Sequence, residues 1–197
     1  MTLETRVSIS EAEQLVKKVF LKNGVREDLA ASVSTALVAA EAEGQVGHGF
    51  SRVKDYIAQV KSKKINVDAI IKIEHPKPTS ISIDADYGFA YPALDQGISE
   101  GALVAKEFGS AVVSIFNSHH CGALSVQVEK IANHGLIGLM MANTPKAIAP
   151  WGGKEPFFGT NPIAFAVPRI AKDPLVIDFS LSKVCLLYTS DAADDTP

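Results

Sequence analysis

The period of the hydrophobic pattern changes near residue 68, and this change constrains the fold more than any other feature of the sequence. Up to that point, apolar residues recur every three to four positions, as on one face of an amphipathic helix. Beyond it, short apolar runs alternate with helical stretches. We therefore predict an α/β fold in which an N-terminal helical bundle, residues 1–68, precedes a sheet-containing domain, residues 69–184.

Three helices are expected in the first part. The first begins after Ser8, which lies three residues before Glu11 at capping-box spacing, and it ends near Gly24. The second runs from about Arg26 through an alanine-rich stretch, and the third follows Gly44, Gly47 and Gly49, with Phe50 as its first inward residue.

The second part contains alternating strand and helix patterns. Two strands are expected around a turn at 75–78, and the later elements are a helix at 91–108, a strand at 111–116, a helix at 123–134, a strand at 136–142 and strands near 163–167 and 175–178. Strand, helix and strand between 111 and 142 have βαβ spacing, so we expect those two strands to share a partly parallel, mixed sheet.

Composition excludes several classes of protein. The 197 residues carry a formal net charge of -3 without a basic cluster, which disfavours nucleic-acid binding. Two cysteines form neither a disulfide framework nor a CxxC metal motif. The apolar runs are too short for a membrane span, and the first residues have no apolar stretch of secretory type. We therefore expect a cytoplasmic protein without membrane or nucleic-acid partners and without a bound metal.

The common catalytic signatures are absent from the sequence. Gly47-His48-Gly49 lacks the third glycine and the preceding strand of a dinucleotide fingerprint. No phosphate-binding P-loop, HExxH motif or GxSxG elbow occurs. These absences disfavour a Rossmann enzyme, a P-loop enzyme and the common hydrolases.

His48 and Arg52 form the first polar constellation. On a helix that begins near His48, the two side chains would lie one turn apart on one face. An imidazole that exchanges a proton, beside a guanidinium that binds carboxylates in a fork, suits a carboxylated substrate. The alternative is a helix-terminal histidine and a surface arginine.

Residues 117–123, with sequence NSHHCGA, form the second constellation, where a strand ends and a helix begins. Ligands often bind at such edges, and the N–H groups of a helix N-terminus favour anions. The alternative is a polar turn in which His119 or His120 caps the helix. Cys121 is interpreted as a packing residue rather than a nucleophile.

Two further loops carry polar residues. Residues 143–153 contain the only tryptophan, Trp151, which either anchors a rigid turn by packing or contacts a ligand. In the loop 159–162, Asn161 could hold a neighbouring loop by hydrogen bonds. Asp178 ends an apolar strand, where it could reach a ribose hydroxyl or cap the residues that follow.

Taken together, five segments resemble the malate/L-lactate dehydrogenase family of NAD(P)-dependent oxidoreductases, which is distinct from the Rossmann-type dehydrogenases. The segments are HGFSR (48–52), NSHHCGALS (117–125), NTPKAIAPWGG (143–153), FGTNPIAFAVP (158–168) and DFSLSKV (178–184). The resemblance implies a non-Rossmann cofactor domain beside a helical domain, incomplete in this chain, and a homodimer as the full-length form. It implies hydride transfer between NAD or NADP and a small 2-hydroxy or 2-oxo acid such as malate, lactate or sulfolactate. Reduction of cyclic imino acids (piperideine- or pyrroline-2-carboxylate) is the alternative, and a non-catalytic binding or assembly module of the same fold is another.

The resemblance also implies roles for individual residues. His48 would donate the proton, Arg52 would bind the substrate carboxylate, and His120 would lie against the nicotinamide or act as the acid itself. Which histidine is the main acid stays open at this point. The residues implied in cofactor contact are His120, Cys121, Gly122, Ala123, Leu124, Thr144, Asp178, Phe179 and Ser180.

Two departures from the family pattern stand out. Gly47 occupies the place where many members have a serine that polarises the histidine. Residues 185–197 match nothing in the family pattern and resemble translated adapter sequence, so we interpret them as a foreign tail. That tail holds three of the twenty-two acidic residues and no basic one, so the entire net charge of the chain lies in it.

Overall fold

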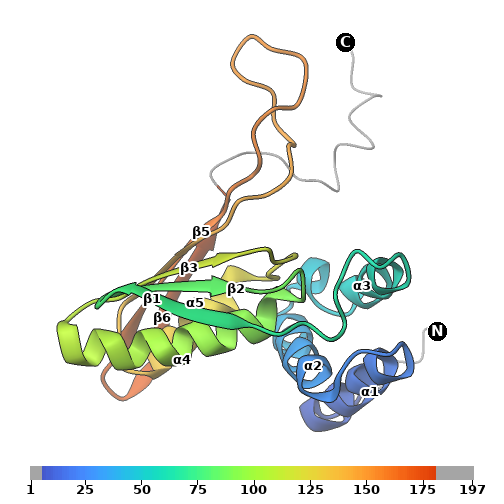
Figure 1. Ribbon diagram of the computed structural model, residues 1–197, viewed down its shortest axis with the longest axis horizontal. Helices are drawn as coiled ribbons and strands as arrows, with labels where there is room; N and C mark the ends of the chain where they lie inside the picture. The colour runs from blue at the N-terminus through green and yellow to red at the C-terminus, as the bar shows by residue number, and fades with distance from the viewer. Residues whose placement is uncertain (1–5, 181–197) are drawn as a thin grey trace. The chain divides into compact units, whose positions relative to one another are not determined.

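The computed structural model describes residues 6–180 of the chain (Figure 1). The chain forms two compact units that divide between Val126 and Gln127. The domain boundary expected after residue 68 stays a prediction, and the proposed foreign tail lies outside the described residues.

The first unit begins with a helical bundle, as predicted. Its helices are α1 (Ile9–Lys22), α2 (Glu27–Ala42) and α3 (Ser51–Lys61). Ser8 and Glu11 form the expected capping box at the start of α1. Burial of apolar residues from all three helices forms the bundle core, whose largest members include Phe20, Leu29, Leu37 and Tyr56.

The third helix follows the glycines as expected, but it does not reach back to His48. His48 is the last residue of a short 3-10 turn, η1 (Val46–His48), and α3 begins three residues later at Ser51. Gly49 separates the two elements with φ -97° and ψ -129°, which is not a helical conformation. His48 and Arg52 therefore do not lie one turn apart on a common helix.

A small sheet of order β1-β2-β3 completes the first unit. β1 (Lys72–Lys77) and β2 (Ser80–Asp84) are antiparallel, whereas β2 and β3 (Val112–Phe116) are parallel and are joined through α4 (Ala90–Phe108). Figure 1 shows α4 lying along one face of this sheet, where Ile81 and Ile83 are buried. The turn predicted at 75–78 is shifted, because β1 continues through Pro76. That proline is tolerated because β1 is an edge strand whose pairing is irregular between Glu74 and Lys77.

The second unit contains an antiparallel sheet of order β4-β5-β6. Its strands are β4 (Gly138–Met141), β5 (Ile163–Arg169) and β6 (Lys172–Phe179). The helix α5 (Leu124–Asn133) crosses the division between the units, and Ile131 near its end packs against Gly138, where a side chain would not fit. The small residues Ala164 and Ala166 are fully buried in this sheet.

The predicted parallel pairing of the strands at 111–116 and 136–142 is wrong in the described part of the chain. β3 belongs to the first sheet, and β4 pairs with β5 instead. Hydrophobic period identifies a strand but does not specify its partner. The strands predicted near 163–167 and 175–178 are present as β5 and β6. No helix between residues 6 and 180 combines the length and apolar character needed to cross a membrane.

Candidate functional site

His48 and His120 lie face to face in the first unit. His48 ends η1, and His120 lies in the loop between β3 and α5. Their rings are stacked, with centroids 5.6 Å apart and an interplanar angle of 14°. The structure therefore brings together two histidines that the sequence predicts as site residues from separate segments.

Two buried tyrosines, which the sequence analysis missed, extend this pair. The hydroxyl of Tyr56 lies 2.7 Å from Nδ1 of His120 and 2.9 Å from the hydroxyl of Tyr91. Burial raises the pKa of Tyr56 to about 12 and raises the pKa of Tyr91 further, so both hydroxyls keep their protons at neutral pH. The spacing of Arg52 and Tyr56, four residues apart on α3, was the signal in the sequence that placed them on one helix face.

His120 is held in its neutral form. Lost hydration around the ring, followed by the nearby charge of Arg52 and the ring of His48, lowers the pKa of His120 to about 4. His120 is exposed as a whole residue, whereas its Nδ1 faces the buried hydroxyl of Tyr56.

This depressed pKa makes stability depend on pH. The unfolded chain binds a proton at His120 near the ordinary value of 6.5, whereas the folded chain binds it near 4, so the folded state is favoured above pH 6.5. We expect the melting temperature to fall as the pH is lowered from 6.5 to 4, and to fall less in His120→Asn. Thermal melts at pH 7 and pH 5 test this, with His134→Asn, which removes an exposed histidine, as the control. An equal pH response of wild type and His120→Asn would contradict the expectation.

Two of the three guanidinium nitrogens of Arg52 contact other groups of the protein. Its Nε donates to the carbonyl oxygen of Gly47 at 2.6 Å, and Nη1 lies 3.6 Å from a carboxylate oxygen of Asp55. The first contact ties the guanidinium to the residue that precedes His48. Among residues 6–180, no hydrogen-bond partner occupies Nη2, so this nitrogen can bind an anionic group.

Glu41 fixes the loop that carries His48, and sequence reasoning missed it as well. One carboxylate oxygen of Glu41 accepts a hydrogen bond from the backbone N–H of Phe50 at 2.8 Å. Gly49 lies so close to Glu41 that any Cβ would overlap with it, whereas Gly47 has open space around it. The end of α2 thus sets the path of the chain through residues 47–50.

The loop at 120–124 packs against the end of α2 and the residues that follow it, within the first unit. Ala123 is buried with Ala40, and Nε2 of Gln45 donates to Oγ of Ser125 at 2.7 Å. Leu124, also predicted to contact the cofactor, is buried. Cys121 is half-buried and forms no disulfide within the described residues.

The neighbouring His119 does not join the stacked pair. Its Nε2 donates to the carbonyl oxygen of Lys64 at 2.7 Å. Of the two adjacent histidines, His120 is therefore the one that reaches the candidate site.

Gly122 combines a left-handed backbone with a close neighbour. Its φ is +70°, and an added Cβ would lie 2.5 Å from the hydroxyl of Tyr91. Gly24 has a similar φ of +82° but nothing within 4 Å, so it is a matched control. We expect Gly24→Ala to cost about 1 kcal/mol through the backbone alone. Gly122→Ala should cost about 1–3 kcal/mol more because Tyr91 must move. Urea unfolding measures both, and equal losses would show that Tyr91 does not constrain this loop.

In the second unit, hydrogen bonds join the two ends of the connection between β4 and β5, and a further one joins this connection to the residue after β6. Oδ1 of Asn161 accepts from the N–H of Thr144 at 3.1 Å, and the N–H of Asn161 donates to Oγ1 of Thr144 at 3.2 Å. Oγ of Ser180 donates to the carbonyl oxygen of Thr160 at 3.3 Å. The prediction that Asn161 holds a neighbouring loop is confirmed.

The remaining residues predicted to contact the cofactor lie in the same unit. Thr144 follows β4, Asp178 and Phe179 end β6, and Ser180 comes directly after it. The interpretation of Trp151 as a packed anchor is wrong, because its side chain is fully exposed. The cofactor contacts of these residues stay predictions.

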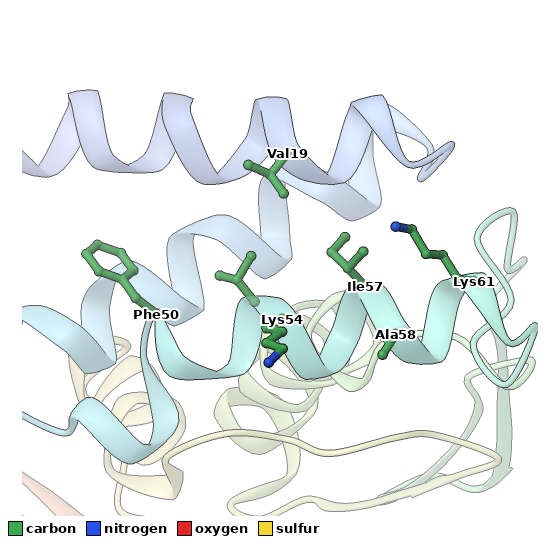
Figure 2. A pocket seen from close by; sticks show the side chains of 7 residues that line it. Val19, Phe50, Lys54, Ile57, Ala58 and Lys61 are labelled. Atoms are coloured by element: carbon green, nitrogen blue, oxygen red, sulfur yellow. The ribbon is translucent and has the colours of Figure 1, made fainter.

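A separate groove lies between α1 and α3. Its cavity measures about 500 Å³, and Figure 2 shows Val19 of α1 facing Ile57 of α3, with Lys61 beside them. None of the residues predicted to be catalytic or to contact the cofactor lines this groove, and its lining is mainly apolar. Within the described ranges, no group of three or more histidine, cysteine or carboxylate side chains is arranged to hold a metal ion.

The fold and site define an α/β protein with paired imidazoles and an arginine in its first unit. Imidazoles can exchange protons, and a guanidinium can bind a carboxylate. Residues 7–193 match the family described as Malate/L-lactate dehydrogenase, and the chain belongs to this family. The match continues past Val184 into the segment that the sequence predicts to be foreign, and the origin of that segment stays a prediction.

Two curated relatives illustrate the range of the family. The chain is 44% identical over 178 residues to the (2R)-3-sulfolactate dehydrogenase (NADP(+)) of Chromohalobacter salexigens, covering 90% of the chain and 53% of the relative. It is 32% identical over 175 residues to the ureidoglycolate dehydrogenase (NAD(+)) of Escherichia coli O157:H7, covering 89% and 50%. The chain thus spans about half the length of the curated relatives it matches.

A solved structure agrees with the fold. The chain matches the crystal structure of delta1-piperideine-2-carboxylate reductase from Pseudomonas syringae with a TM-score of 0.90 and 30% identity. The match covers 96% of the chain and 58% of the other protein. Its relatives are thus NADP- or NAD-dependent dehydrogenases and a reductase.

Proposed function

We propose that the protein is an NAD(P)-dependent oxidoreductase that transfers a hydride between the nicotinamide and a small 2-hydroxy or 2-oxo acid. The observation that carries the proposal is the stacked pair of His48 and His120, with Arg52 tied to the residue before His48. The relative that acts on sulfolactate supports an acidic substrate of this size.

The residues of the site supply binding and proton exchange. When bound, NAD(P)H supplies the hydride. The substrate oxygen then gains negative charge, which a neighbouring imidazole neutralises by donating a proton. Arg52 binds the substrate carboxylate through its Nη2 edge and so orients the carbonyl group toward the histidines.

The start of α5 is the part of the proposed cofactor site that suits a phosphate-containing ligand. Residues 120–123 lead directly into α5, whose first N–H groups favour an anion. Gly122 gives this turn its left-handed backbone, with a φ of +70°. The proposed contacts from the second unit are Thr144, Asp178, Phe179 and Ser180.

Reduction of a cyclic imino acid is the second candidate. The structural match to the piperideine-2-carboxylate reductase favours it, because such a substrate also carries a carboxylate and takes up a proton at nitrogen. The same residues would serve either reaction, so only the substrate distinguishes them.

A substrate panel tests both candidates. Oxidation of NADH and NADPH is followed with oxaloacetate, pyruvate, sulfopyruvate and piperideine-2-carboxylate, and binding of each cofactor is titrated separately. Turnover with an open-chain acid supports the first candidate, and turnover with the cyclic imine supports the second. A folded protein that binds neither cofactor would contradict both and favour a non-catalytic module.

We further propose that the protein acts as a cytoplasmic homodimer in its full-length form. The support is the family resemblance, together with coverage of about half of the matched relatives. On this proposal a form as long as the curated relatives turns over faster than these 197 residues alone. Equal rates for the two would contradict this.

A further inference from the structure

Tyr91, Tyr56 and His120 form a continuous hydrogen-bonded row inside the first unit. The row crosses three elements, with Tyr91 on α4, Tyr56 on α3 and His120 in the loop before α5. The two tyrosines are 1% and 2% exposed, so their hydroxyls depend on each other and on the imidazole for hydrogen bonds.

The backbone N–H of Gly122 fixes which groups donate and which accept along this row of hydrogen bonds. Its N–H, which can only donate, points to Nδ1 of His120 at 3.3 Å. Nδ1 therefore presents its lone pair, and the proton of the neutral ring lies on Nε2. Tyr56 then donates its O–H to Nδ1 and accepts the O–H of Tyr91.

The groups around the ring leave Nε2 for a ligand. His48 from η1 stacks on the ring, and the charges of Arg52 and Asp55 from α3 act on it, in addition to the tyrosines. Cys121 of the same loop acts on Tyr56. Among the residues that the structure describes, none pairs with Nε2.

We propose that Tyr56, held in place by Tyr91, is a positioning residue that fixes His120 as the Nε2–H tautomer, so that this N–H donates to a carbonyl-type oxygen of the bound ligand. The donation to the ligand rests on the proposed function, whereas the tautomer does not. His120 then acts as a neutral donor over the physiological pH range, which leaves the exchange of the reacting proton to His48. The oxygen belongs either to the substrate or to the nicotinamide amide.

Nitrogen NMR on the whole, isotope-labelled chain tests the tautomer. We expect His120 to show an unprotonated Nδ1 and a protonated Nε2 from pH 5 to pH 8, with the signals assigned by their loss in His120→Asn. Tyr56→Phe removes only the hydroxyl and should give a mixture of tautomers, whereas Tyr87→Phe, which alters an exposed tyrosine, should not. A protonated Nδ1 in wild type, or an unchanged single tautomer in Tyr56→Phe, would overturn the inference. The wild-type spectrum alone determines the tautomer of His120, even if a variant does not fold.

Two ligands identify the acceptor. Oxamate alone represents the substrate, and NADH or NADPH alone represents the cofactor. We expect one of them to shift the Nε2–H signal, and we expect Tyr56→Phe to bind that ligand about fivefold more weakly, the effect of one hydrogen bond. Binding that shifts other signals but leaves Nε2–H unchanged would overturn the donor role. Absence of any binding, with the single tautomer retained, would instead count against the proposed function.

Discussion

Replacing His48 with asparagine is expected to lower the turnover number by about 10²–10⁴-fold, the usual contribution of general acid–base catalysis. Asparagine keeps a polar side chain of similar size but does not exchange a proton. The effect should exceed that of His120→Asn, because Nδ1 of His120 already accepts hydrogen bonds from Tyr56 and Gly122. The Michaelis constants should change much less than the turnover number.

Steady-state rates across pH 5–9 check this expectation. The ionisation that governs the wild-type rate should disappear in His48→Asn and persist in His120→Asn. His134→Asn controls for the general effect of removing a histidine, since His134 is exposed and belongs to the second unit. Full activity of His48→Asn would remove this histidine from the mechanism, and a larger loss in His120→Asn would exchange the two roles.

Replacing Arg52 with alanine is expected to raise the Michaelis constant for a carboxylated substrate by about 10- to 100-fold, because a hydrogen bond to a charged group contributes about 1.5–3 kcal/mol. The turnover number should fall as well, since the contact from Nε to the carbonyl oxygen of Gly47 helps to place His48. Arg52→Lys should recover part of the charge but not the forked geometry.

An uncharged substrate distinguishes the two roles of Arg52, which are binding of the substrate carboxylate and placement of His48. The variant and wild type should handle the methyl ester of the same 2-oxo acid with similar Michaelis constants, because the ester does not engage the guanidinium as an anion. Lys54→Ala, which removes an exposed cation from the same helix, is the matched control and should leave both constants unchanged. An equal rise for acid and ester in Arg52→Ala would show that Arg52 acts only through the loop at residue 47.

The local elements were largely predictable because short-range signals specify them. The capping box at Ser8 and Glu11 starts α1 as expected, and the apolar run at 112–116 forms β3. The hypothesis of a helix that reaches back to His48 was wrong, because a glycine interrupts the helical pattern there. Gly49 ends η1 and delays α3 until Ser51, so the reasoning that joined His48 to Arg52 on one helix was wrong although the two residues are linked through Gly47.

Strand pairing and the buried partners of the site were not predictable. β4 pairs with β5 rather than β3, since the period of a strand carries no information about its neighbour. Tyr56 and Tyr91 were assigned no role, because aromatic residues on helices are most often core residues and their polar ends are visible only once the helices pack.

The sequence by itself determined the succession of elements, the family resemblance and three of the chemical groups, His48, Arg52 and His120. These depend on residue type and on spacing within short segments. The tertiary structure alone decided that the two imidazoles stack at 5.6 Å, that Glu41 fixes the loop at residues 47–50, and that Tyr56 and Gly122 meet at Nδ1 of His120. The physical reason is that the direction of a hydrogen bond and the protonation state of a ring depend on atoms from α2, α3, α4 and the 117–123 loop, which only packing of the folded chain brings within contact distance.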